Sequence, residues 1–129
     1  MNIALWIAAG MLAAVALAGG FTKSFLPVEK LGAATHGGEW TGDAAPAFVR
    51  TLGVLEILAA IGLVLPALTG VAPVLVPVTA VCWVGLMIGA MITHLRYAGG
   101  ARFAGLNLIY LVIAVFVAWG RFGIAPFAG

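Results

Sequence analysis

The sequence contains very little charge. Of its 129 residues, six are Lys or Arg and four are Asp or Glu, whereas hydrophobic residues make up 64% of the chain. Soluble domains are about 25% charged and about 45–50% apolar, so an ordinary soluble globule is excluded. A disordered chain is excluded as well, because disorder combines low hydrophobicity with high net charge. A single-domain integral membrane protein, covering residues 1–129, remains.

Groups that carry covalent, metal or haem chemistry are also scarce. Cys82 is the single cysteine, so the chain lacks the cysteine pair with which some four-helix membrane oxidoreductases reduce quinones. We expect Cys82 to be a small core residue. The two histidines, His36 and His94, are far apart in the sequence, and no spacing fits a metal site. We therefore expect no metal and no covalently bound cofactor. The net charge of +2 is too small to indicate a nucleic-acid partner.

The sequence consists mostly of long apolar runs. Each is close to the ~20 residues with which a helix crosses ~30 Å of hydrocarbon. None alternates between apolar and polar residues as the strands of a membrane β-barrel do. The sequence therefore predicts an all-α integral membrane protein, an antiparallel bundle of four transmembrane helices in contact with the lipid bilayer. The predicted spans cover residues 3–21, 47–65, 74–93 and 103–120.

The links between the runs predict the topology. Pro27 is a typical first residue of a short helix, which we expect to lie along the membrane interface in the first link. The uncharged link 66–73 makes the second and third spans antiparallel neighbours. Five of the six basic residues flank the links 22–46 and 94–102, and Arg121 alone is on the other side. The excess of positive charge on cytoplasmic loops places both links in the cytoplasm and both termini outside.

Gly85 and Gly89 form a GxxxG pattern in the third run. Small residues at this spacing let two membrane helices approach closely. The pattern predicts a helix-packing face, which would serve either the fold of one chain or a homodimer.

Glu56 is the residue that most needs an explanation. It is the tenth of 19 residues in its run, which places it ~15 Å from the start of the helix, near the middle of the membrane. An acidic residue there costs about 2.5–3.5 kcal/mol on insertion scales. Gly53 and Ala60 share its face, so we expect Glu56 to point into the bundle, either as a protonated acid or in an ion pair. Candidate partners from the same membrane surface are Lys23, Arg50, His94, Asn107 and the deeper Tyr110.

This set of polar groups allows three functions. An acid, a histidine and a tyrosine around an apolar slot suit a lipid-soluble carbonyl compound such as a quinone: His94 or Tyr110 would donate to a carbonyl, and Glu56 would relay protons. Arg50 and Asn107 would then position the ligand. Alternatively, the polar groups serve the fold of a non-catalytic membrane partner or assembly protein. The third function is a small proton-coupled transporter, although small four-helix exporters carry their key acid in the first span. No residue is assigned a catalytic role.

Several stretches of the chain resemble DoxX-like membrane proteins, in an order that covers nearly the whole sequence. Lys23 and Pro27 after the first run are similar to the family, as is Asn107. The resemblance implies site positions at Arg50, Glu56, His94, Asn107 and Arg121. The longest similar stretches are 50–66 (RTLGVLEILAAIGLVLP), 89–94 (GAMITH) and 116–122 (FVAWGRF).

The resemblance implies a four-helix protein of the inner (plasma) membrane in a redox setting. Some members of the family are the membrane partner in thiosulfate-to-quinone oxidoreduction, and others are placed in oxidative-stress complexes. For this chain we therefore expect a multi-pass subunit of an oxidoreductase complex that binds a quinone and meets a soluble or membrane-bound redox partner.

Overall fold

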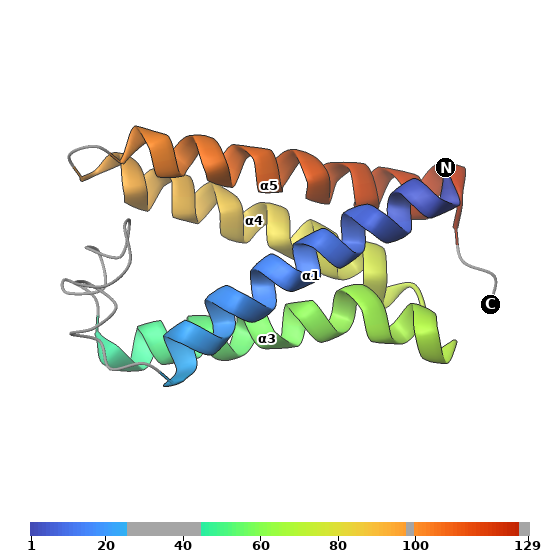
Figure 1. Ribbon diagram of the computed structural model, residues 1–129, viewed down its shortest axis with the longest axis horizontal. Coiled ribbons are helices and arrows are strands. Elements are labelled where there is room, and N and C mark those ends of the chain that lie inside the picture. The colour runs from blue at the N-terminus through green and yellow to red at the C-terminus, as the bar shows by residue number, and fades with distance from the viewer. Residues whose placement is uncertain (26–44, 98–99, 127–129) are drawn as a thin grey trace.

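The described part of the chain is entirely helical. The computed structural model describes residues 1–25, 45–97 and 100–126 (Figure 1). No strand occurs within these ranges. The interfacial helix that was predicted in the first link lies outside them. The helices are α1 (Asn2–Phe25), α3 (Pro46–Thr69), α4 (Leu75–Leu95) and α5 (Ala101–Trp119), the last continued by the π-helical turn η2 (Gly120–Ile124).

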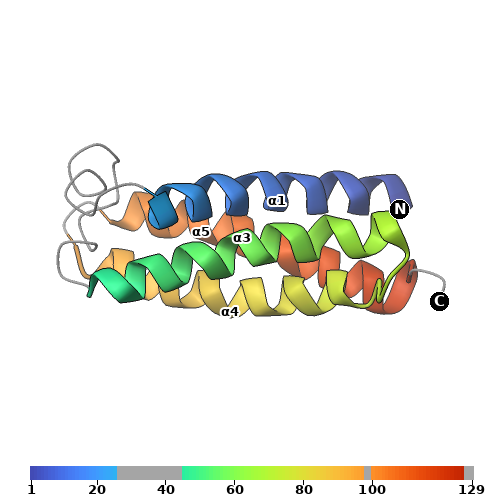
Figure 2. The same cartoon turned by 90° about the horizontal axis from the view of Figure 1, so that it is seen from below.

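These helices are long and apolar enough to cross a membrane, and α5 with η2 forms one continuous span, Ala101–Ile124. They run antiparallel in chain order, so both termini lie at the same end of the bundle (Figures 1 and 2). We call this the terminal end, and the opposite end, where α1 stops and α3 starts, the polar end. The predicted all-α bundle of four membrane-spanning helices is confirmed.

Proline and glycine explain where α3 begins and ends. Pro46 stands in its first turn, where the missing N–H costs no hydrogen bond. The helix then continues through Pro66, at which the sequence predicted the link to begin. Neighbouring helices let membrane helices tolerate such a proline. Termination comes at Gly70, whose φ of 73° is left-handed and whose N–H bonds to the carbonyl oxygen of Pro66 at 3.0 Å.

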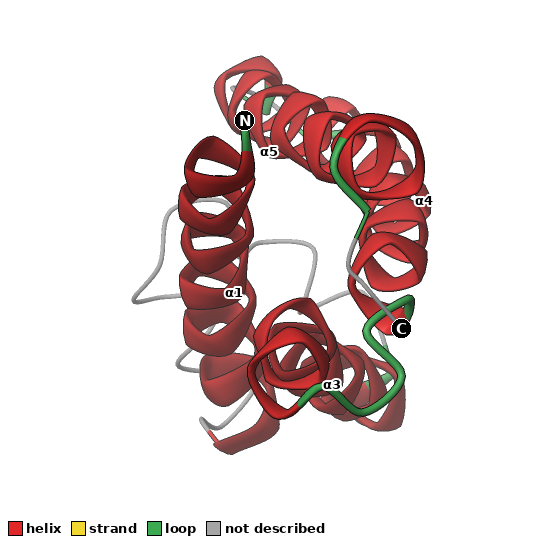
Figure 3. Ribbon diagram, turned by 90° about the vertical axis from the view of Figure 1, so that its right-hand side faces the viewer, coloured by secondary structure: helices red, strands yellow, loops and turns green. Residues whose placement is uncertain are grey.

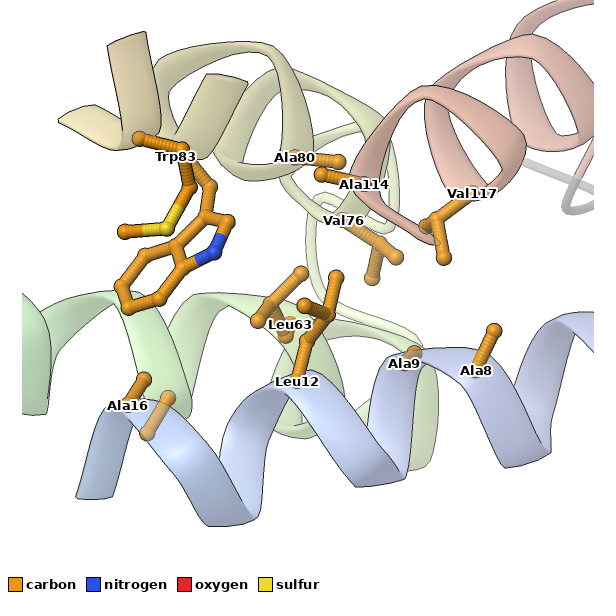
Figure 4. Packing of buried hydrophobic residues seen from close by; sticks show 12 residues of the cluster. Ala8, Ala9, Leu12, Ala16, Leu63, Val76, Ala80, Trp83, Ala114 and Val117 are labelled. Atoms are coloured by element: carbon orange, nitrogen blue, oxygen red, sulfur yellow. The ribbon is translucent and has the colours of Figure 1, made fainter. Parts of the chain in front are cut away.

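Seen from one end, the four helices form a ring in the order α1, α3, α4, α5 (Figure 3). The closest pairs are α1 with α3 and α4 with α5, and the contacts between the two pairs are fewer. The apolar core that joins the pairs is rich in alanine around one tryptophan (Figure 4). Its buried members are Ala8, Ala9, Leu12, Ala16, Ala60, Leu63, Val76, Ala80, Trp83, Met87, Ala114 and Val117.

Glycine determines how closely two of the helix pairs approach. A Cβ atom at Gly20 of α1 would lie 2.7 Å from the carbonyl oxygen of Gly53 on α3. On the other side of α3, a Cβ atom at Gly62 would lie 2.5 Å from Oγ1 of Thr79 on α4. Small residues thus let the backbones of α1 and α3 touch, as membrane helices require for close packing.

The glycines on the outer face of α4 contact no other helix of the described chain. Gly85 and Gly89 are exposed, and a Cβ atom at either position would meet nothing within 4 Å. Cys82 is exposed on the same helix. The prediction of a core cysteine is therefore wrong, because this face of α4 is turned away from the alanine-rich core. If Gly85 and Gly89 form a packing face, its partner lies outside the described part of the chain.

Arg121 fastens the terminal end of the bundle. Although charged, it is only 4% exposed. Its Nη1 donates hydrogen bonds to Oδ1 of Asn2 at 2.8 Å and to the carbonyl oxygen of Ala125 at 2.9 Å. The neighbouring Gly120 leaves room for Leu5, which a Cβ atom would strike. Arg121 therefore ties the first turn of α1 to the π-helical turn, far from the other basic residues of the described chain.

Candidate functional site

Glu56, the buried acid of α3, forms an ion pair with Lys23 of α1. Nζ of Lys23 lies 3.0 Å from Oε2 and 3.3 Å from Oε1 of Glu56, and donates a hydrogen bond to each. Glu56 is only 7% exposed. Because α1 ends and α3 begins at the polar end, the long lysine side chain reaches from the last turn of α1 to an acid several turns into α3. The ion pair offsets the cost of burying either charge alone.

The ion pair depends on the small residues of α1. A Cβ atom at Gly19 would lie 3.4 Å from Nζ of Lys23 and 3.5 Å from both carboxylate oxygens of Glu56. The charged groups therefore rest directly on the backbone of α1. One residue further along, the contact between Gly20 and Gly53 sets the distance between the two helices. A wider crossing would separate the lysine from the glutamate.

Arg50 holds the end of α1 in place. Its Nη1 donates a hydrogen bond to the carbonyl oxygen of Lys23 at 2.7 Å. The last carbonyl groups of a helix have no partner within the helix, so this cation, about one turn into α3, satisfies one of them and is attracted to the negative end of the helix dipole. Arg50 thus positions the backbone from which Lys23 reaches Glu56.

The other predicted site residues lie on α4 and α5. His94, in the last turn of α4, has its ring centroid 5.5 Å from that of Phe103. Asn107 and Tyr110 are half-buried on α5, and Tyr110 packs against the apolar core. At 1.5 Å per residue, Asn107 lies ~9 Å, Tyr110 ~14 Å and Glu56 ~15 Å from the polar end of their helices. The structure brings Lys23, Arg50 and Glu56 into contact and places Asn107 and Tyr110 at similar depths on the facing helix pair.

Asn107 contains a hydrogen-bond donor without an acceptor. Its Nδ2 is buried, and no acceptor lies within hydrogen-bond distance among the described residues. An unsatisfied polar group in hydrocarbon costs several kcal/mol. Two further buried polar atoms also have no hydrogen-bond partner among the described residues. They are Oγ of Ser24, which lies against Gly53, and Nε1 of Trp83.

Neither Ser24 nor Trp83 was among the site residues predicted from the sequence. The signal for Trp83 was its place in the chain. Tryptophans of membrane helices concentrate at the two interfaces, whereas Trp83 stands well inside its apolar run. A buried tryptophan normally needs a partner for its N–H.

Within residues 1–25, 45–97 and 100–126, no three His, Cys, Asp or Glu side chains lie close enough together to hold a metal ion. The arrangement offers an ion pair and unpartnered N–H donors in an apolar surrounding, which suits the binding of an uncharged ligand with oxygen acceptors.

Comparison with known protein families gives a match over most of the chain. A model of the DoxX-like family matches residues 7–117, which is most of the chain and covers α3 and α4 in full and most of α1 and α5. No curated protein and no solved structure matches.

Proposed function

We propose that this chain, which belongs to the DoxX-like family, binds a lipophilic carbonyl compound inside its helical bundle as the membrane subunit of a redox complex. A quinone is the ligand whose chemistry fits best. Its head group would lie between the α1–α3 pair and Asn107 of α5, and its apolar tail would remain in contact with the bilayer. Electrons for quinone reduction would come from a soluble or membrane-bound partner protein.

The buried amide N–H of Asn107 carries this proposal, because it requires an acceptor that the described residues do not provide. Lys23 adds a second donor. An ammonium group has three N–H bonds, and the described contacts use two of them, both on Glu56. N–H donors at this end of the bundle favour an uncharged molecule with exposed carbonyl oxygens over a cation.

Glu56 gives the site a proton relay. A quinone that takes up two electrons also takes up two protons to become a quinol. The Glu56–Lys23 pair can pass a proton towards a carbonyl oxygen only if the ligand lies beside it. Tyr110, at nearly the same depth, and His94, nearer the surface, would serve the second carbonyl.

The test is mass spectrometry of lipids extracted from protein purified in mild detergent. We expect a stoichiometric quinone in the wild type and its loss from folded Asn107→Leu and Glu56→Gln variants. Thr51→Val is the control, because it removes an exposed hydroxyl from the same helix as Glu56. Finding only bulk phospholipid in the wild type, or quinone retained by both site variants, would contradict the proposal.

One observation favours a second function, that of a membrane partner or assembly protein. The exposed face of α4 with Gly85 and Gly89 is open for another helix, from a second copy or from a different protein. On this reading, Gly85→Leu abolishes association measured by native mass spectrometry from membranes. Gly105→Leu on α5, another glycine with open space around it, leaves association unchanged. Equal association in both variants would exclude this face.

The remaining alternative, a small proton-coupled transporter, stays a prediction from the sequence. A transport acid must release and rebind protons or cations. The Lys23–Glu56 ion pair serves a proton relay to a bound ligand equally well, so it gives this function no separate support.

A further inference from the structure

Access to the interior of the bundle differs between its two ends. At the polar end, Lys23 stands two residues before the end of α1, and 23% of its side chain is exposed. The side chain of Glu56, deeper in the bundle, is only 9% exposed. Leu12, Leu63 and Val117, which lie nearer the terminal end, are fully buried. Exposure of the interior therefore decreases from the polar end and reaches zero beyond Glu56.

The Lys23–Glu56 ion pair spans this gradient of exposure. Nζ of Lys23 contacts both carboxylate oxygens of Glu56, and no other ionisable side chain of the described residues forms a hydrogen bond or ion pair with this acid. A proton can move along these hydrogen bonds from the ammonium group to the carboxylate. Lys23 stands only ~3 Å from the end of its helix, at 1.5 Å per residue. Its amine can therefore regain a proton from water at the membrane surface.

The core on the other side of Glu56 offers protons no comparable path. Its buried members contribute no carboxyl, hydroxyl or imidazole group. A buried water, which could replace such a group, needs two to four polar partners, and these side chains do not supply them. Arg121 is buried at the terminal end, but a guanidinium group does not release its proton in proteins. Among the described residues, only the polar end therefore provides a route for protons to Glu56.

Reduction of a quinone beside Glu56 would draw on this route. Two electrons from the partner protein and two protons convert the quinone into a quinol. Lys23 passes a proton to Glu56, the carboxyl group of Glu56 passes it to a carbonyl oxygen, and water at the polar end restores the ammonium group. The other carbonyl oxygen would take its proton from Tyr110 or His94, which also stand in the polar halves of their helices.

We infer that Glu56 exchanges protons only with the side of the membrane at which the polar end lies, through Lys23, and that a bound quinone draws both of its protons from that side. This inference rests on the proposed function and adds to it the side from which the protons come. A site with this access takes up protons on one side and provides no path for them to the other.

A cysteine at Gly19 tests the side from which water reaches the ion pair. A Cβ atom there would lie 3.4 Å from Nζ of Lys23 and 3.5 Å from both carboxylate oxygens. Gly19→Cys therefore places a thiol beside the pair and leaves both charges in place. The exposed Cys82 is first replaced by serine. Ala16→Cys is the matched control, because Ala16, one turn nearer the terminal end on the same helix, is fully buried.

The reagent is 2-sulfonatoethyl methanethiosulfonate, which is small and charged, applied to right-side-out and inside-out membrane vesicles. Arg96→Cys marks the side of the polar end and Val71→Cys that of the terminal end, because both positions are exposed. Gly19→Cys should react in the vesicles in which Arg96→Cys reacts. There it should react at least about tenfold faster than Ala16→Cys, because a buried thiol reacts only after local opening. If Ala16→Cys does not fold, Leu12→Cys, also at a fully buried position, replaces it.

The contact of Lys23 with water is tested by NMR. The sequence has two lysines, Lys23 and Lys30, so ¹⁵N-lysine labelling gives two side-chain signals, which Lys30→Arg assigns. Saturation of the water signal should be transferred to the Nζ protons of Lys23, because they exchange with water at the polar end.

Reaction of Gly19→Cys from the terminal side, or from neither side, would overturn the inference. A Lys23 signal that receives no saturation from water would also overturn it, because protons could not then enter through this side chain. Neither measurement involves a quinone, so either failure leaves the proposed function standing. Absence of a quinone from the lipid extract of the wild type would instead overturn the proposed function, and with it the proton transfer to a quinone.

Discussion

The Lys23–Glu56 ion pair shows how the chain tolerates charge inside the membrane. Removing one partner of a buried pair leaves an uncompensated charge, whereas removing both can be nearly neutral. We expect Lys23→Met to lower the free energy of unfolding by about 2–3 kcal/mol. Because Lys23 keeps 23% of its side chain exposed, the effect should fall at or below the lower end of the range for fully buried pairs.

Unfolding in mixed micelles of the single variants and of the Lys23→Met/Glu56→Gln double variant measures this coupling. The double variant should recover most of the stability lost by Lys23→Met. Additive losses would show that the two side chains do not stabilise one another. This double-mutant cycle also gives the free energy of unfolding of Glu56→Gln itself. Loss of ligand from that variant can then be separated from unfolding.

The buried acid and four cationic or amide side chains that could contact it were predicted from the sequence. Which of the four forms the contact could not be predicted. Glu56 was recognised because an acid deep in an apolar run is costly. The choice of Lys23 follows from the crossing of α1 and α3, which depends on Gly20, Gly53 and the cap by Arg50. Such contacts between distant segments leave no periodic signal in the chain, and the same holds for the unpartnered N–H of Trp83.

At the scale of the helices, one glycine contact sets the geometry of the site. A Cβ atom at Gly20 would lie 2.7 Å from a backbone oxygen and 2.8 Å from a backbone nitrogen of α3, and backbone atoms cannot rotate away. We therefore expect Gly20→Ala to destabilise the protein by about 1–3 kcal/mol, and to lengthen the Lys23–Glu56 contact.

Gly10→Ala is the matched control, because Gly10 lies on the same helix with nothing within 4 Å of an added Cβ atom. Alanine is the better helix former by about 1 kcal/mol, so this variant should be neutral or slightly more stable. Thermal unfolding of the two variants in the same detergent checks the difference. Equal unfolding temperatures of the two variants would mean that the packing of α1 against α3 does not depend on the glycine contact.

Boundaries of the helices were harder to predict than their existence. Each apolar run becomes a helix because the bilayer leaves no other way to satisfy the backbone. The helices nevertheless extend beyond the runs: α1 includes Lys23 and Ser24, and α3 passes through Pro66 to Thr69. Polar side chains can continue a helix to the membrane surface, so hydropathy alone underestimates its length.

For the whole molecule, the two ends of the bundle have different roles. The alanine-rich core and the contacts of Arg121 fasten the terminal end. Charge and unpartnered donors gather at the polar end, where Lys23, Arg50 and Asn107 lie. A lipophilic ligand would therefore bind where fewer buried apolar residues join the two helix pairs.

The orientation of these ends is a prediction of the charge distribution. Four of the five basic residues in the described part of the chain belong to the polar end, which favours its placement on the cytoplasmic side, with both termini outside. In a Cys82→Ser background, Val71→Cys in the link between α3 and α4 should react with a membrane-impermeant maleimide in intact cells. Val71 is 70% exposed, so access within the protein does not limit the reaction.

Arg96→Cys, at an exposed position just after α4, is the opposing reporter. It should react only after the membrane is made permeable, because the charge distribution predicts that the polar end faces the cytoplasm. The reverse pattern would place Lys23, Arg50 and Glu56 near the outer surface. A partner that delivers electrons to a quinone at this site would then have to approach from outside the cell membrane, so the labelling result also decides on which side a redox partner should be sought.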